Sequence, residues 1–310
     1  MTKFPGYPSN PRRFHVRPGI AMSYLDEGPR DGEVVVALHG NPSWSYYWRT
    51  LVAGLVDPAP GKPYRVIVPD HVGMGLSDKP DDRPGATPRY DYTLQSRVDD
   101  LQALLHHAGI DDDTPVTLAV HDWGGMIGFG WALAHAAQVK RLVILNTAAF
   151  PMPAAKPMPW QIALGRDYFV GEVLIRSFNA FSSGASYQGV QRRMPADVRA
   201  AYVAPYDSWR NRISTVRFMQ DIPLSPKDPA WPLLEAAGHA LASFADRPAF
   251  IGWGLKDFVF DHHFLQRFRT DLPQAQVMAF DDAGHYVLED KYEVLVPAIR
   301  AFLDAHPLPA

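Results

Sequence analysis

The chain has 310 residues, of which 47% are hydrophobic and 20% charged, and its formal net charge is −3 at pH 7. This is the composition of an ordinary globular protein, and it excludes a disordered or collagen-like chain. The 30 Lys and Arg against 33 Asp and Glu leave no basic excess for nucleic acid. The absence of cysteine excludes disulfides, cysteine nucleophiles and thiolate metal sites.

The N-terminal stretch "MTKFPGYPSNPRRF" has no apolar core of the length that a signal peptide needs. No stretch reaches the roughly 18 to 20 apolar residues that span a membrane. We therefore expect a cytoplasmic protein without a transmembrane segment.

The first half of the chain alternates between strand-like runs and helical patterns. The Val, Ile and Leu content of the strands is typical of a parallel sheet covered on both faces. The predicted strands are "AMSYLDEG" (21–28), "EVVVALHG" (33–40), "YRVIVPD" (64–70), "VTLAVHD" (116–122) and "VKRLVILNTA" (139–148). The predicted helices are "TLQSRVDDLQALLHHAGI" (93–110) and "GGMIGFGWALAHAA" (124–137).

The alternation stops after residue 149 and resumes near residue 240. Between them lie Pro, Trp and Tyr residues and helix-like pieces such as "WQIALGRDYFVGEVLIRSF" (160–178) and "PADVRAAYVAPY" (195–206). The later elements are "RPAFIGWG" (247–254), "HHFLQRFRT" (262–270), "AQVMAF" (275–280) and "EVLVPAIRAFLDAH" (293–306). We predict an α/β fold with a doubly wound, mostly parallel sheet. Residues 1–149 and 240–310 form its core domain, and 150–239 form an inserted helical cap.

Polar loops follow four of these strands, where ligand sites of doubly wound sheets lie. They are "LHGNP", "HDWGG", "GLKDFVFD" and "DDAGHYVLED". A nucleophile at a strand–turn–helix corner, followed along the chain by an acid and a histidine, is the order of an α/β-hydrolase triad. Where a serine is usual at the corner, this chain has Asp122.

The sequence resembles the haloalkane dehalogenases of the α/β-hydrolase superfamily over nearly its whole length. The pieces that carry the resemblance are "LHGNPSWSYYWR", "PDHVGMGLSDKP", "HDWGG", "GLKDFVFD" and "DDAGHYVLED". A finer resemblance, to the branch that includes the β-lactone decarboxylases of bacterial long-chain olefin biosynthesis, is carried by "NTAAFP", "PMPWQIALGR", "FNAFSSGAS" and "NRISTVRFMQDIPL".

Displacement at a saturated carbon explains an aspartate at the corner. A serine would form an ether that activated water cannot cleave, whereas a carboxylate forms an ester that water can hydrolyse. We predict Asp122 as the nucleophile, His285 as the base that activates water, and Asp257 as the carboxylate that orients His285. The structural alternatives are a helix N-cap for Asp122, a core histidine for His285 and a turn residue for Asp257.

The choice of acid rests on the resemblance, because Asp261 and Asp282 lie nearby in the sequence. Asp257 matches the family position, and the strand before the insertion, from which some dehalogenases take their acid, carries Asn146 instead.

The leaving group needs hydrogen-bond donors in a water-poor pocket. By resemblance these are the side chains of Asn41 and Trp123, which match the family's halide-binding pair, while their backbone N–H groups would form the oxyanion hole. A turn cap for Asn41 and core packing for Trp123 are the structural alternatives. His39 and Gly40 are interpreted as turn-forming support, and His121 as a packed residue.

The aromatic and Met residues of the insertion predict an apolar pocket wall over Asp122. Its expected lining residues are Trp160, Phe178 and Phe181. No cofactor and no metal are expected, because neither histidine pair, at 106 or at 262, has a zinc-type spacing.

Three reactions fit these residues, all on a small apolar substrate. The first is decarboxylation of long-chain cis-β-lactones to alkenes and CO2, and the second is hydrolysis of haloalkanes to alcohol and halide. Epoxide hydrolysis is the third, since those relatives use paired cap tyrosines; Tyr168, Tyr187, Tyr202 and Tyr206 are available. A non-enzymatic binding protein is the alternative of another class. By resemblance, assembly with other olefin-biosynthesis enzymes is a further expectation.

Overall fold

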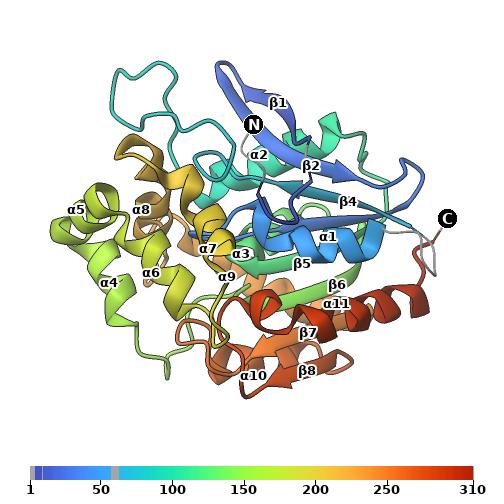
Figure 1. The fold of residues 1–310 in the computed structure, drawn as a ribbon. Coiled ribbons are helices and arrows are strands. Elements are labelled where there is room, and N and C mark those ends of the chain that lie inside the picture. Colours follow the sequence, from blue (N-terminus) through green and yellow to red (C-terminus); the bar gives the residue numbers. More distant parts are fainter. Residues whose placement is uncertain (1–3, 9, 57–62, 310) are drawn as a thin grey trace.

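The computed structural model describes residues 4–8, 10–56 and 63–309. Residues 1–3, 9, 57–62 and 310, all of which belong to the predicted core domain, lie outside the described residues. An eight-stranded sheet has the order β1-β2-β4-β3-β5-β6-β7-β8 (Figure 1). The strands are β1 Arg12–Arg17, β2 Ile20–Glu27, β3 Glu33–Leu38, β4 Tyr64–Pro69, β5 Val116–Asp122, β6 Val139–Thr147, β7 Ala249–Gly254 and β8 Gln276–Phe280.

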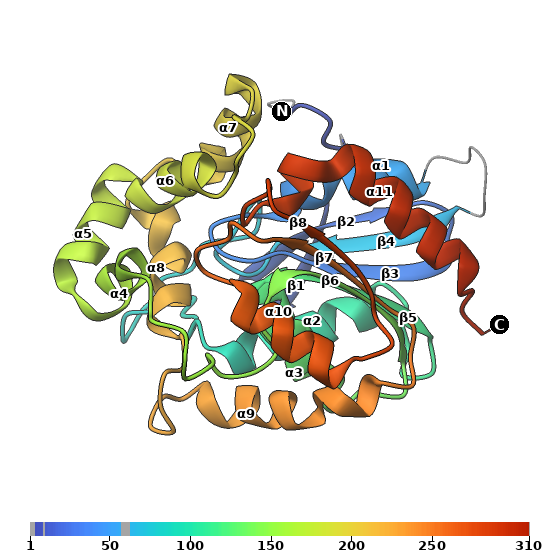
Figure 2. The same ribbon diagram turned by 90° about the horizontal axis from the view of Figure 1, so that it is seen from below.

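The sheet is mostly parallel and is covered by helices on both faces. Strands β1, β2 and β4 pair antiparallel, and the pairs from β4 through β3 to β8 are parallel. Figure 2 shows α1 and α11 on one face and α2, α3 and α10 on the other. These helices are α1 Arg49–Val56, α2 Leu94–His107, α3 Trp123–Ala132, α10 His262–Asp271 and α11 Val287–Ala305. The predicted α/β-hydrolase architecture is confirmed.

A group of short helices follows β6 and stands beyond the carboxyl ends of the parallel strands (Figure 2). They are α4 Trp160–Asp167, α5 Phe169–Phe178, α6 Ala180–Gln188, α7 Ala196–Val203 and α8 Ile213–Gln220. The helix α9, Trp231–Ala240, falls inside the range predicted for the cap but packs along α3 of the core. The division of the chain at residues 149 and 240 stays a prediction.

Neither the strand β1 nor the helix α1 was predicted from the sequence. The strand β1 reads "RRFHVR", so charged residues interrupt any apolar run, and it forms because β2 supplies partners for its backbone. The helix α1 is a single short segment of eight residues, and its apolar face packs on α11 and β4. Among the described residues, no helix combines the length and apolar character needed to cross a membrane.

Candidate active site

Asp122 stands at the sharp corner between β5 and α3. Its backbone has φ 53° and ψ −128°, a conformation that is strained for a residue other than glycine. The corner is crowded: a Cβ on Gly40 would lie 1.8 Å from Asp122 Oδ1, and one on Gly124 would lie 2.1 Å from the carbonyl oxygen of Leu38. The small residues therefore allow the carboxylate to sit between two loops.

The Asp122 carboxylate is held by backbone donors and is not a helix cap. Its Oδ1 accepts the backbone N–H of Asn41 at 2.6 Å, and the backbone N–H of Trp123 also stabilises the carboxylate. No side-chain capping bond to α3 is formed. Burial raises the pKa of Asp122 to about 6, against the lowering effects of His285 and of these two N–H groups. A pKa of about 6 leaves the Asp122 carboxylate largely ionised at neutral pH.

His285 lies between two carboxylates. It comes from the loop between β8 and α11, and its Nδ1 is 2.8 Å from Asp257 Oδ2, while its Nε2 is 3.6 Å from Asp122 Oδ2. Burial alone would lower the pKa of the imidazole, but Asp257, and then Asp122, outweigh it, so that the pKa of His285 is raised. His285 thus connects the two carboxylates, an arrangement that could serve as nucleophile, base and orienting acid.

Asp257 is the acid that reaches His285, and its rivals are engaged elsewhere. Its Oδ2 also accepts Asn146 Nδ2 at 3.0 Å, and its Oδ1 accepts the backbone N–H of Val259 at 2.8 Å. Asn146 therefore stands beside the acid and helps to hold it. Asp261 caps α10, and the mostly exposed Asp282 pairs with Lys291.

Asn41 and Trp123 line the same cavity as Asp122 and His285. The Asn41 side chain donates from Nδ2 to the carbonyl oxygen of Thr215 in α8, at 2.9 Å. An amide nitrogen carries two hydrogens, so one N–H of Asn41 is left for a ligand. The indole of Trp123 packs edge to face against Phe218, also in α8, with ring centroids 5.1 Å apart. Both candidate donors thus contact one helix of the insertion.

The cavity above the triad has a volume of about 290 Å³ and a mainly apolar wall. Beyond the predicted residues, its walls include Met126, Met152, Met219, Ile175, Phe260 and Leu234. Met126 follows Asp122 by four residues in α3, a spacing that places it on the same helix face and would have allowed its prediction. The others come from the insertion and from distant loops, and no local pattern marks them.

A family model for the alpha/beta hydrolase fold matches residues 33–292. The chain belongs to the α/β-hydrolase family. A cis-3-alkyl-4-alkyloxetan-2-one decarboxylase of Xanthomonas campestris pv. campestris is 74% identical over 98% of this chain and 99% of its own length. One of Shewanella oneidensis is 51% identical over 94% of this chain and 88% of its own length.

Among solved structures, the haloalkane dehalogenase DbeA from Bradyrhizobium elkani is similar, with a TM-score of 0.82 and 25% identity. The match covers 96% of this chain and 98% of that one. The resemblance of this α/β-hydrolase to haloalkane dehalogenases, and more strongly to β-lactone decarboxylases, is confirmed.

Of the three insertion residues expected at the cavity of this α/β-hydrolase, two lie there. Trp160, at the start of α4, and Phe181, in α6, line the cavity, and Trp160 is 71% exposed at its mouth. Phe178 is 72% exposed and is not part of the cavity wall. It is the last residue of α5, where Asn179 takes a left-handed conformation and reverses the chain. Its placement in the pocket is therefore not supported.

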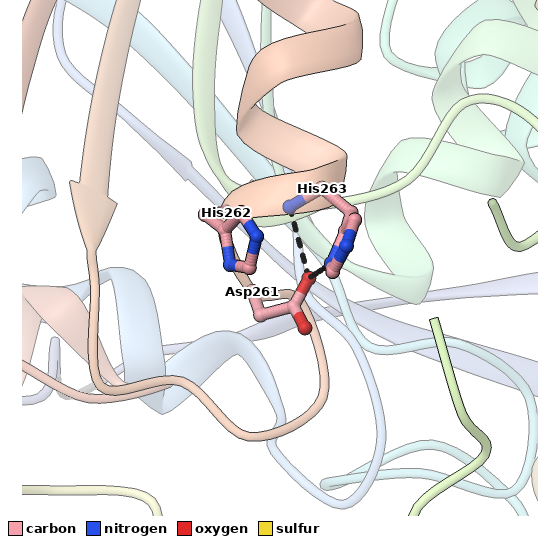
Figure 3. Close-up of side chains that lie close together, drawn as sticks. All are labelled: Asp261, His262 and His263. Carbon is pink, nitrogen blue, oxygen red and sulfur yellow. Dashed lines mark hydrogen bonds and ion pairs between the residues drawn. The ribbon is translucent and has the colours of Figure 1, made fainter. Parts of the chain in front are cut away.

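Among the residues that the structure describes, one cluster has metal-ligand chemistry, Asp261 with His262 and His263 (Figure 3). Asp261 Oδ1 accepts the backbone N–H of His263 at 3.0 Å, as the capping residue of α10. Its Oδ2 lies 3.1 Å from Lys156 Nζ of the insertion. The Lys156 ammonium already neutralises the Asp261 carboxylate. The cluster is therefore explained as a helix cap that forms an ion pair with the insertion.

Proposed function

We propose that this α/β-hydrolase decarboxylates cis-β-lactones bearing two long alkyl chains, giving an alkene and CO2. The observation that carries the proposal is the Asp122 carboxylate, which lies beside His285 and lines one apolar cavity together with Asn41 and Trp123. The named activity of the relatives at 74% and 51% identity supports the same substrate class. An apolar wall suits alkyl chains, because their burial there is favourable by about 25 cal/mol per Å².

In the proposed reaction, Asp122 attacks the ring carbon that bears the lactone oxygen. The C–O bond breaks, its electron pair leaves as a carboxylate, and an alkyl ester forms on Asp122. The new carboxylate then loses CO2: its C–C bond breaks, that electron pair forms the C=C bond, and the C–O bond to Asp122 breaks. Asp122 is regenerated as a carboxylate. Atoms and charge balance without water.

The site residues have distinct roles in this proposal. Asn41 Nδ2–H and Trp123 Nε1–H stabilise the charge that develops on the departing oxygen, where donors in a dry site count most. The backbone N–H groups of Asn41 and Trp123 aim Asp122 at the ring carbon. His285, held by Asp257, keeps Asp122 ionised before the attack. Once the ester has formed, Asp122 is neutral and no longer favours the imidazolium.

Haloalkane hydrolysis is the second candidate, because the same attack would expel a halide and the neutral His285 would activate water. The structural similarity to the haloalkane dehalogenase DbeA supports this second reaction. Epoxide hydrolysis is not favoured, because it needs tyrosine acids in the cavity and none of the four insertion tyrosines is part of the cavity wall. Tyr202 donates to Glu289 and Tyr206 to the carbonyl oxygen of Ser43, while Tyr168 and Tyr187 are exposed.

We further propose that the enzyme works in the cytoplasm and assembles with other enzymes of olefin biosynthesis. The first rests on the sequence features described above, and the second on the resemblance alone. Co-purification with a tagged copy of the chain would test the assembly.

A side-by-side product assay tests the reaction. The purified protein receives a cis-β-lactone with two alkyl chains, and separately 1-bromoalkanes and 1-iodoalkanes, each beside an Asp122→Asn control. We expect alkene and CO2 from the lactone, halide release that is slower or absent, and no product with the control. Fast halide release with an inert lactone would establish the dehalogenase instead.

A further inference from the structure

The interior of the molecule holds a cation that the proposed chemistry does not use. Arg97 of α2 has a fully buried side chain, and its Nη1 lies 2.7 Å from Asp221 Oδ2. Asp221 is the residue that follows α8, so this ion pair joins the core to the insertion helix that contacts Asn41 and Trp123. Burial of a charge is costly unless it is well paired, which makes the surroundings of this guanidinium informative.

The guanidinium of Arg97 faces aromatic rings more than hydrogen-bond acceptors. Its Cζ lies 3.7 Å from the ring centroid of Phe218 and 5.2 Å from that of Trp123. Its Nε and Nη2 are buried and have no hydrogen-bond partner among the described residues. A cation over an aromatic ring is attracted by the electron density of its face, so the cluster of Arg97, Phe218 and Trp123 helps to fix the plane of the indole.

The same helix also fixes the second candidate donor. The carbonyl oxygen of Thr215, one turn before Phe218 in α8, accepts one N–H of the Asn41 side chain at 2.9 Å. The start of α8 lies close to the core, because the Ser214 side chain packs against Gly73. A Cβ added to Gly73 would lie only 2.5 Å from Ser214 Cβ. At its end α8 is held by the ion pair of Arg97 and Asp221. A shift of α8 would therefore move the supports of Asn41 and Trp123 together.

We propose that Arg97 is a positioning residue: by holding α8 through Asp221 and Phe218, it aims the side-chain N–H groups of Asn41 and Trp123 at the departing oxygen. This inference rests on the proposed function, since it assigns that task to the two donors. Arg97 acts through α8 and touches neither the substrate nor the reacting atoms.

Physical reasoning sets the expected kinetic signature. Donors that meet charge only as it develops stabilise the transition state more than bound substrate, so misaimed donors lower kcat and leave KM nearly unchanged. Loss of one such donor costs about 100- to 1000-fold in kcat. We expect a smaller loss, about 10- to 100-fold, when a donor stays in place but is misaimed.

The experiment compares two matched substitutions, Arg97→Lys and Arg65→Lys. Arg65, on β4, is likewise buried and pairs with Asp26 at 2.9 and 3.1 Å, and its side chain also donates to the carbonyl oxygen of Ala108. None of these three residues belongs to α8 or to the cavity wall. Three quantities are measured for each variant: the melting temperature, kcat and KM with whichever substrate the wild type turns over, and amide hydrogen exchange of residues 213–221. The exchange measurement needs no turnover, so it tests the link to α8 even where the lactone proves inert.

We expect both variants to melt at a lower temperature. Only Arg97→Lys should lower kcat by about 10- to 100-fold at nearly constant KM, and only this variant should speed exchange in α8. Equal kcat values for the two variants would overturn the proposal, as would wild-type exchange in α8. Should Arg97→Lys not fold, Asp221→Asn takes its place. That change keeps the cation and weakens its hold on α8, and a wild-type kcat together with wild-type exchange would overturn the proposal as well.

Discussion

His285 Nε2 lies 3.6 Å from Asp122 Oδ2, close enough for each group to shift the titration of the other. The carboxylate favours the imidazolium, and the imidazolium favours the carboxylate. When Asp122 becomes an ester this support disappears. The pair therefore links formation of the covalent intermediate to the protonation state of the histidine.

Replacing Asp122 by Asn should lower the pKa of His285. The sign follows from charge: the raised pKa has Asp257 and Asp122 as its electrostatic causes, and removal of one anion destabilises the imidazolium. The measurement is a pH titration of the His285 ring signals by NMR, assigned with a His285→Gln sample. His263, which contacts Asp261 instead, is the internal control. An unchanged or raised His285 pKa in the variant would contradict the coupling.

The rate should rise with pH through about 6 and then level off. Burial raises the Asp122 pKa to about 6, and only the ionised carboxylate attacks, so acid removes the nucleophile. The apparent pKa of the rate profile belongs to the coupled pair of Asp122 and His285. The profile of kcat/KM against pH reports it, because that quantity reflects the free enzyme. A flat profile down to pH 4.5 would exclude Asp122 as the group that must be ionised.

Turnover in H2¹⁸O should leave Asp122 unlabelled if the enzyme is a decarboxylase. Expulsion of the alkene returns both carboxylate oxygens, whereas hydrolysis of an aspartyl ester inserts one oxygen from water. Mass spectrometry of the peptide that contains residue 122, after many turnovers, separates the two outcomes. A label gained with the lactone would show that its ester is hydrolysed, and a haloalkane that is turned over serves as the positive control.

Gly40→Ala should reduce kcat by at least about 100-fold, because the new Cβ would lie 1.8 Å from Asp122 Oδ1 and the carboxylate would have to move. Gly109→Ala is the control, since its Cβ would meet open space and only its φ of +76° is strained. That variant should lose about 1 to 2 kcal/mol of unfolding free energy and keep its kcat. Measurements of kcat and of urea unfolding on both proteins test the contrast; equal kcat values would count against the close packing at Asp122.

Several features of the site could be predicted from short sequence patterns. Asp122 and Asn41 follow buried strands, Asp257 and His285 follow later ones, and carboxyl ends of parallel strands share one edge of a sheet. Residues at those ends therefore lie along one edge, and the order of the strands in the sheet decides which of them meet. The choice of Asp257 over Asp261 depended on the resemblance, and the structure shows the reason for it: Asp261 is occupied at the start of α10.

The insertion was predicted only in outline. Its helices are short, and which face of each turns inward depends on contacts with neighbours that lie far away in the sequence. Trp160 and Phe181 line the cavity while Phe178 does not, and nothing in the three local sequences separates them. The support of Asn41 by Thr215 joins residues 174 positions apart, which no local pattern can show.

The sequence by itself determined the fold class and pointed to Asp122, Asp257 and His285 as candidates in the order of a triad, because strand periodicity and the strand–turn–helix corner at Asp122 are encoded within a few neighbouring residues. Only the tertiary structure decided how the donors are aimed, which insertion residues line the cavity, and where the buried Arg97 stands. Those features arise from packing between segments that lie far apart in the sequence. The free energy of that packing depends on all of these segments together, so no single segment encodes it.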